Sequence, residues 1–176
     1  MLSEFYSTMA QVCFTLLGLW WVVVQFKYQD LMRDRRRRQM AYDTSLYFVL
    51  PGIMSLVSLL EPNGQLLWRV TFASAAILGA LETIFLLFND RGAAIYHRSM
   101  RVVHWGGFVL YSLVALLALL PDLVTSIGLE VATIQVEGIF LALLVFLGVN
   151  TTWVQFAGMG RREPSDELPA PRDFMP

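Results

Sequence analysis

The amino-acid sequence predicts an all-α integral membrane protein, a bundle of about five transmembrane helices with the N-terminus outside and the C-terminus in the cytoplasm. Three observations lead to this prediction: the composition, five long apolar runs and the placement of the basic residues. The chain of 176 residues is 56% hydrophobic and 15% charged, and its mean hydropathy is +0.56. Soluble domains carry about 25% charged residues. This chain therefore has too few charges to cover a water-facing surface.

The five apolar runs approach the length of about 20 residues that a helix needs to cross a bilayer. They cover residues 5–26, 46–60, 66–88, 102–120 and 131–156. A helix satisfies its own backbone groups in lipid, and the runs lack the alternation of barrel strands. We expect residues 1–157 to form one bundle. Residues 158–176 contain four prolines among mixed charges, which predicts a disordered cytoplasmic tail.

The second run is short and contains Pro51-Gly52. Proline removes one helical hydrogen bond, so the pair predicts either a tolerated kink or an unwound hinge that exposes carbonyl groups. Turn signals at Pro62 and Asn63-Gly64, and later at Pro121-Asp122, separate the neighbouring runs. The connections are too short to hold another domain.

The basic residues favour five spans. They form three groups: Lys27, Arg33, Arg35, Arg36, Arg37 and Arg38; Arg91, Arg98 and Arg101; and Arg161, Arg162 and Arg172. Short cytoplasmic loops are enriched in such residues, and only five spans with the N-terminus outside place all three groups in the cytoplasm. No basic residue precedes the first run, which predicts an uncleaved anchor instead of a signal peptide. We expect a multi-pass protein of the plasma or inner membrane.

The run of four arginines, Arg35, Arg36, Arg37 and Arg38, has two interpretations. At the cytoplasmic end of a membrane helix it is a topology signal that also contacts anionic lipid headgroups. In a soluble protein it would suggest a nucleic-acid patch, but no aromatic or glycine-rich binding surface accompanies it. We expect the lipid bilayer as partner, leave a homo-oligomer open, and expect no nucleic acid.

Polar and small residues recur along the first run at steps of three and four. This polar stripe consists of Glu4, Thr8, Gln11, Thr15, Gly18 and Gln25, and Val22 is the one apolar residue at this spacing. Such spacing places them on one helix face. The stripe suits either a packed seam between helices or a water-lined path. We expect it to be covered by other helices of the chain or by a second subunit.

Two carboxylates fall deep inside the predicted helices. Glu82 lies about 12 Å from the cytoplasmic end of its helix, and Glu137 about 10 Å below the outer surface, at about 1.5 Å per residue. Gln11 is expected near the depth of Glu137. Tyr111 is expected near the depth of Glu82, as a hydrogen-bond partner for it, and His104 lies one to two turns nearer the cytoplasm. These five residues are the candidates for an ion or proton pathway.

No motif indicates an enzyme, a metal or a cofactor. The chain has two histidines, His97 and His104, and lacks the zinc, nucleophile-elbow and phosphate-loop motifs. The single cysteine, Cys13, is expected to be a small buried apolar residue. Arg69, on the outer side, is expected to reach headgroups or to pair with Glu61, Asp122 or Glu130.

Three functional classes follow from these observations. A small oligomeric channel or transporter for a cation or proton ranks first, because two separate helices carry deep carboxylates. A non-catalytic accessory or scaffold subunit is the alternative, and a membrane-embedded enzyme ranks last. A transporter should surround the carboxylates with a hydrated cavity, whereas a scaffold should bury them in complete hydrogen-bonded pairs.

The predicted orientation can be tested with single cysteines at Asn63 and at Ser99, labelled on intact cells with an impermeant thiol reagent. We expect labelling at position 63 and none at position 99, because the loop containing Arg91 and Arg98 is expected in the cytoplasm. The reverse pattern would exclude this topology.

Overall fold

The computed structural model describes residues 2–29, 35–60, 65–89, 96–120 and 133–159. These parts contain five helices and no strand: α1 (Leu2–Phe26), α3 (Arg35–Leu60), α4 (Gln65–Asn89), α5 (Tyr96–Leu119) and α7 (Thr133–Met159). All five contain a stretch that is long and apolar enough to cross a membrane. The predicted all-α bundle of membrane-spanning helices is confirmed. The turn signals after α3 and after α5, and the tail, fall outside the described residues.

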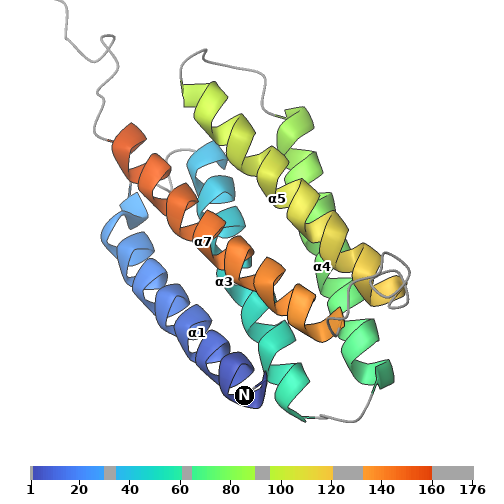
Figure 1. Ribbon diagram of the computed structural model, residues 1–176. Helices are drawn as coiled ribbons and strands as arrows, with labels where there is room; N and C mark the ends of the chain where they lie inside the picture. Colours follow the sequence, from blue (N-terminus) through green and yellow to red (C-terminus); the bar gives the residue numbers. More distant parts are fainter. Residues whose placement is uncertain (1, 30–34, 61–64, 90–95, 121–132, 160–176) are drawn as a thin grey trace, which may run out of the picture.

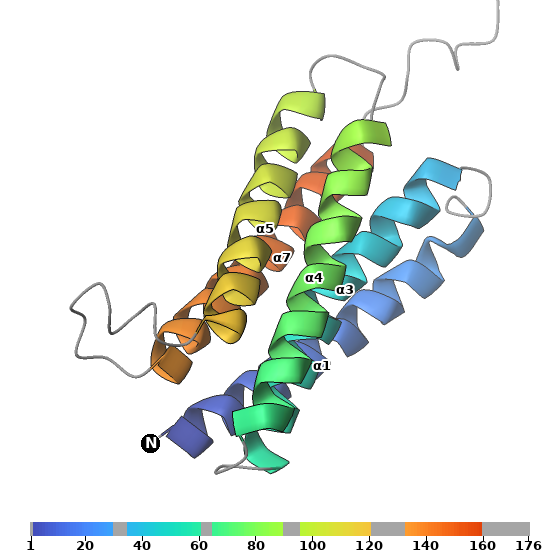
Figure 2. The same ribbon diagram turned by 90° about the vertical axis from the view of Figure 1, so that its right-hand side faces the viewer.

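The helices form one up-and-down bundle in which successive helices run in opposite directions (Figure 1). The most extensive contacts join α4 to α5 and α1 to α3. Helix α3 also contacts α4 and α7, and α7 contacts α5, so α3 and α7 connect the two pairs (Figure 2). The C-terminus of α1 and the N-termini of α3 and α5 lie at one end of the bundle, called here the basic end (Figure 2). Lys27 directly follows α1, Arg37 and Arg38 lie in the first turn of α3, and Arg101 lies in the second turn of α5.

Helix α3 begins well before the apolar run expected at 46–60. It starts at Arg35, and its membrane-length part starts at Arg37. The residues just before position 46 are polar, but Thr44 and Ser45 each donate a hydroxyl hydrogen bond of 3.0 Å to the carbonyl four residues earlier. Such bonds satisfy the hydroxyls within the helix itself. The helix therefore brings polar residues into the bundle that hydropathy alone places in a loop.

Helix α3 is continuous through Pro51, so the unwound alternative for the Pro51-Gly52 pair is wrong. The Pro51 carbonyl accepts a hydrogen bond of 2.7 Å from the Ser55 hydroxyl. A Cβ atom at Gly52 would lie 3.2 Å from Cys13 and from Phe14, which shows how closely α1 approaches α3 here. Cys13 is fully buried and has a free thiol, as expected.

Glycines allow large aromatic rings to fill the centre of the bundle. The ring of Tyr111 on α5 lies against Gly79 on α4, where a Cβ atom would approach ring carbons to 2.6 Å. The hydroxyl of Tyr47 on α3 similarly lies against Gly107 on α5. These rings join a fully buried apolar core that includes Met54, Phe72, Leu141 and Leu144.

We expect Gly79→Ala to lower the free energy of unfolding by about 1–3 kcal/mol, since the added methyl group must displace the Tyr111 ring. The matched control is Gly18→Ala on α1, because a Cβ atom there meets nothing within 4 Å. Thermal unfolding in detergent measures both variants. Equal midpoints for the two variants would contradict the close approach of α4 and α5.

Candidate functional site

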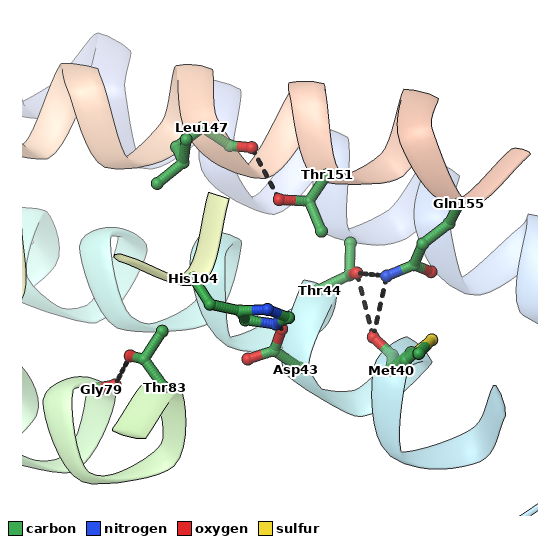
Figure 3. Close-up of polar contacts among 9 residues, drawn as sticks. All are labelled: Met40, Asp43, Thr44, Gly79, Thr83, His104, Leu147, Thr151 and Gln155. Atoms are coloured by element: carbon green, nitrogen blue, oxygen red, sulfur yellow. Dashed lines mark hydrogen bonds and ion pairs between the residues drawn. The ribbon is translucent and has the colours of Figure 1, made fainter. Parts of the chain in front are cut away.

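A carboxylate and an imidazole meet inside the bundle. Asp43 on α3 and His104 on α5 lie with Oδ2 and Nε2 3.2 Å apart, and their side chains are 5–6% exposed. An isolated charge buried in this way would cost several kcal/mol, whereas a paired one is partly compensated. The contact between Asp43 and His104 therefore offsets part of the free-energy cost of burying both side chains between α3 and α5 (Figure 3).

A hydrogen-bonded group connects α7 to the same part of α3 (Figure 3). The Gln155 amide donates to the Thr44 hydroxyl oxygen at 2.6 Å and to the Met40 carbonyl at 3.2 Å. The Thr44 hydroxyl donates to the same carbonyl. Both Thr44 and Gln155 are buried. The Thr44 hydroxyl and the Gln155 amide nitrogen both have defined partners, and the hydrogen bonds of Gln155 hold α3 and α7 together.

Two tyrosine hydroxyls lie buried near the pair without a hydrogen-bond partner among the described residues. Tyr47 is one helical turn from Asp43, and Tyr111 is two turns from His104 on α5. Their ring centroids are 6.0 Å apart. Neither hydroxyl makes a hydrogen bond to a described residue. The predicted hydrogen bond between Tyr111 and Glu82 is thus wrong, because the Tyr111 ring lies against Gly79, one turn away from Glu82.

Glu82 on α4 lies at the edge of the polar cluster, which consists of Asp43, His104, Thr44, Gln155, Tyr47 and Tyr111. Its side chain is partly exposed, and it lies within electrostatic range of Asp43. Like charges close together in a low-dielectric interior repel each other. Glu82 therefore belongs to the same electrostatic group as the Asp43–His104 pair.

Glu137 lies apart from this cluster, towards the end of the bundle opposite the basic end. It is fully buried on α7, and neither carboxyl oxygen has a hydrogen-bond partner among the described residues. The Tyr6 hydroxyl of α1 donates instead to the Ile134 carbonyl at 2.7 Å, one turn from Glu137. Phe5 packs against Gly138 beside it, where a Cβ atom would approach the ring to 2.9 Å. The first turns of α1 thus pack against the part of α7 that carries this carboxyl group.

The polar stripe of α1 faces outward. Thr8, Gln11, Thr15 and Gly18 are exposed. Helix α1 instead buries the face that carries Tyr6, Ala10, Cys13 and Trp20. Tyr6 and the Trp20 indole, which donates to the Ala41 carbonyl at 3.0 Å, both find backbone partners on that side. The described helices of the same chain therefore do not cover the stripe, and Gln11 is not grouped with the buried carboxyl groups.

Arg69 and the arginine run lie at opposite ends. The Arg69 guanidinium donates hydrogen bonds to the carbonyls of Ala118 and Leu119, at 3.1 and 3.0 Å, and so caps the C-terminus of α5. The acidic partners expected for it fall outside the described residues. Arg37 and Arg38 are exposed at the start of α3, and the side chains of Arg35 and Arg36 lie outside the description, as does that of His97.

Sequence reasoning missed Asp43, Tyr47, Thr44 and Gln155. Asp43 precedes the apolar run expected at 46–60, so hydropathy alone leaves it outside the membrane-spanning part. The signal that could have found it is the spacing of Asp43 and Tyr47, four residues apart and thus on one helix face. Among the described residues, no three side chains of His, Cys, Asp or Glu come together in a way that could hold a metal ion.

The chain was compared with protein-family models, curated proteins and solved structures, and none of them matches. Any functional interpretation therefore depends on the site itself. Chemically, the site combines a carboxylate–imidazole pair, two unbonded phenol groups and a second carboxylate nearby. Each of these groups can accept or release a proton.

The interaction of Asp43 with His104 can be measured by a double-mutant cycle with Asp43→Asn and His104→Gln. We expect the losses in free energy of unfolding to be non-additive by about 0.5–3 kcal/mol, as for buried contacting residues. Chemical unfolding in mixed micelles provides the measurement. Asp43→Asn combined with Ser74→Ala, an exposed residue on α4, is the control cycle and should be additive. Additivity in both cycles would show that the two side chains do not interact.

Proposed function

We propose that this protein carries protons across a membrane and that Asp43 and His104 form the group that takes up and releases them. The observation that supports this most directly is the buried contact between the two side chains, 3.2 Å apart within the helix bundle. Ionisable residues at membrane depth are costly, and where they occur they usually mark substrate or proton paths. A structural role alone would be served as well by apolar side chains of similar volume.

Other polar groups extend along the bundle from this pair. Tyr47 and Tyr111 offer hydroxyl groups beside it, and Glu82 offers a partly exposed carboxyl group. Glu137 lies further along the bundle axis. From Gln155 to Glu137, α7 rises by about 27 Å at 1.5 Å per residue, which is close to the hydrocarbon thickness of about 30 Å. Gln155 contacts Thr44, the residue next to Asp43. The Asp43–His104 pair and Glu137 therefore lie near opposite ends of α7.

An apolar layer lies between Glu137 and the cluster around His104. Met54, Phe72, Leu141 and Leu144 are fully buried in this region. Close packing of this kind leaves no room for a hydrated metal cation. A proton needs only a transient chain of hydroxyl groups or water molecules, so the packing favours a proton over a larger ion. Transport would then require the layer to open in part of a cycle.

Proton flux into liposomes tests the proposal. Purified protein is reconstituted with a pH-sensitive dye inside, and a potassium gradient with valinomycin drives proton entry. We expect flux from the wild type, and a loss of at least about tenfold in Asp43→Asn and in His104→Gln, because each removes one side chain of the proposed proton-carrying pair. Glu82→Gln and Glu137→Gln should each lower the flux while the protein still elutes as the folded species in size exclusion.

Ser74→Ala is the matched control, since Ser74 is exposed and its hydroxyl bonds only within α4. Its flux should equal that of the wild type. Absence of flux in the wild type at every pH and driving force, or equal flux in Asp43→Asn and the wild type, would contradict the proposal. Flux that resists His104→Gln but not Asp43→Asn would exclude the pair while leaving the carboxyl group as a carrier.

A second candidate is a scaffold subunit, which the outward position of the polar stripe favours. Gln11 and its neighbours on α1 face the surface of the bundle, where lipid offers no hydrogen-bond partner. A helix of a second subunit would satisfy these groups, at about 0.6 kcal/mol per hydrogen bond. Mass measurement in mild detergent should then give a species heavier than the chain of 20.0 kDa, and Gln11→Leu should weaken it. A monomer in both proteins would contradict this role.

A further inference from the structure

An apolar groove runs along the surface of the bundle between α1 and α7. Its volume is about 380 Å³, within the range of roughly 300–1,000 Å³ for small-molecule sites. Helix α1 contacts α7 much less than it contacts α3, which leaves the groove between them. The lining comes mainly from Leu16, Leu19, Trp20 and Val23 of α1 and from Phe146, Val149 and Trp153 of α7, over Phe48 of α3.

The two polar side chains in the lining make hydrogen bonds within α7. The Asn150 amide donates to the Phe146 carbonyl at 2.8 Å, and the Thr152 hydroxyl donates to the Gly148 carbonyl at 3.0 Å. A ligand in the groove therefore meets apolar surface with few polar groups left to recognise. This surface suits a hydrocarbon chain and does not suit a polar or charged molecule.

The groove points towards the basic end of the bundle. Its α1 side ends at Val23, and the backbone N–H of Lys27 donates to the Val23 carbonyl, so Lys27 lies one helical turn beyond the groove. Lys27, Arg37 and Arg38 are exposed at this end. An anionic group attached to the end of a hydrocarbon chain would meet this positive charge.

We propose that the groove holds one acyl chain of an anionic phospholipid whose phosphate lies beside Lys27. The apolar lining binds the chain, and the exposed Lys27 at the basic end selects the headgroup. From Leu16 to Lys27, α1 rises by about 16 Å, roughly the depth of one leaflet of the hydrocarbon core. This site does not depend on proton transport. Here one anionic lipid molecule binds at a defined place, in addition to the general attraction between basic residues and anionic lipid.

Native mass spectrometry of the protein in mild detergent tests the site, with phosphatidylglycerol and phosphatidylcholine of identical acyl chains. We expect one phosphatidylglycerol molecule to bind in preference to phosphatidylcholine. Lys27→Gln should reduce this preference about fivefold, the contribution of one basic side chain near an anionic lipid. Val149→Trp should fill the groove and reduce the binding of both lipids.

Each variant has a matched control. Arg101→Gln removes an exposed basic residue at the same end of the bundle but on α5, and Val109→Trp adds the same bulk to an exposed position on α5 outside the groove. Both controls should bind lipid as the wild type does. Equal affinity of the wild type for both lipids, or equal losses in variants and controls, would overturn the proposal. So would a dimer that Val149→Trp dissociates, because a protein helix would then occupy the groove.

Discussion

Hydrocarbon offers no hydrogen-bond partner, so every polar group inside this bundle must be satisfied by the protein itself or remain costly. Many hydroxyl groups meet this requirement within their own helix. Several serines and threonines donate to the carbonyl four residues earlier; they are Thr44, Ser45, Ser55, Ser58, Thr83, Thr151 and Thr152. These local bonds let polar residues enter a membrane helix without a partner on another helix, and α3 depends on them most.

The remaining polar side chains need partners on other helices, and these cross-links determine how the helices sit. Trp20 connects α1 to the Ala41 carbonyl of α3, and Gln155 connects α7 to Thr44 on the same helix. Asp43 connects α3 to His104 on α5. All three links meet α3 within its first three turns. Because they converge there, the polar part of α3 joins helices that hydrophobic packing in lipid would hold only weakly.

Some buried polar side chains have no hydrogen-bond partner among the described residues. Tyr47, Tyr111 and Glu137 are buried and lack hydrogen-bond partners among the described residues, although nearby serines and threonines have them. An unpaired buried hydroxyl or carboxyl costs about 1–3 kcal/mol or more. Glycines at positions 79, 107 and 138 leave space for the aromatic rings around these groups. The bundle thus accommodates buried aromatic and acidic residues whose unpaired polar atoms carry a cost in stability.

The two sides of α1 also differ in how their polar groups are satisfied. Its inward face makes defined bonds through Tyr6 and Trp20, whereas its outward face carries Gln11 and Thr15 towards the membrane. Helix α1 therefore has a structural side and a side available to lipid or to another subunit. The groove beside α7 continues this outer surface towards the basic end.

The sequence by itself determined the class of the protein, because hydropathy and run length are properties of each segment alone. It was sufficient for five spanning helices and for the burial of Cys13. It could not reveal the start of α3, since the polar residues before position 46 become acceptable only when Asp43 meets His104 and Thr44 meets Gln155. Nor could spacing decide which face of α1 turns inward, because a stripe of small polar residues suits a seam as well as an exposed face. The tertiary structure decided both points, since a polar side chain in lipid is stable only where another helix places a partner within hydrogen-bond distance.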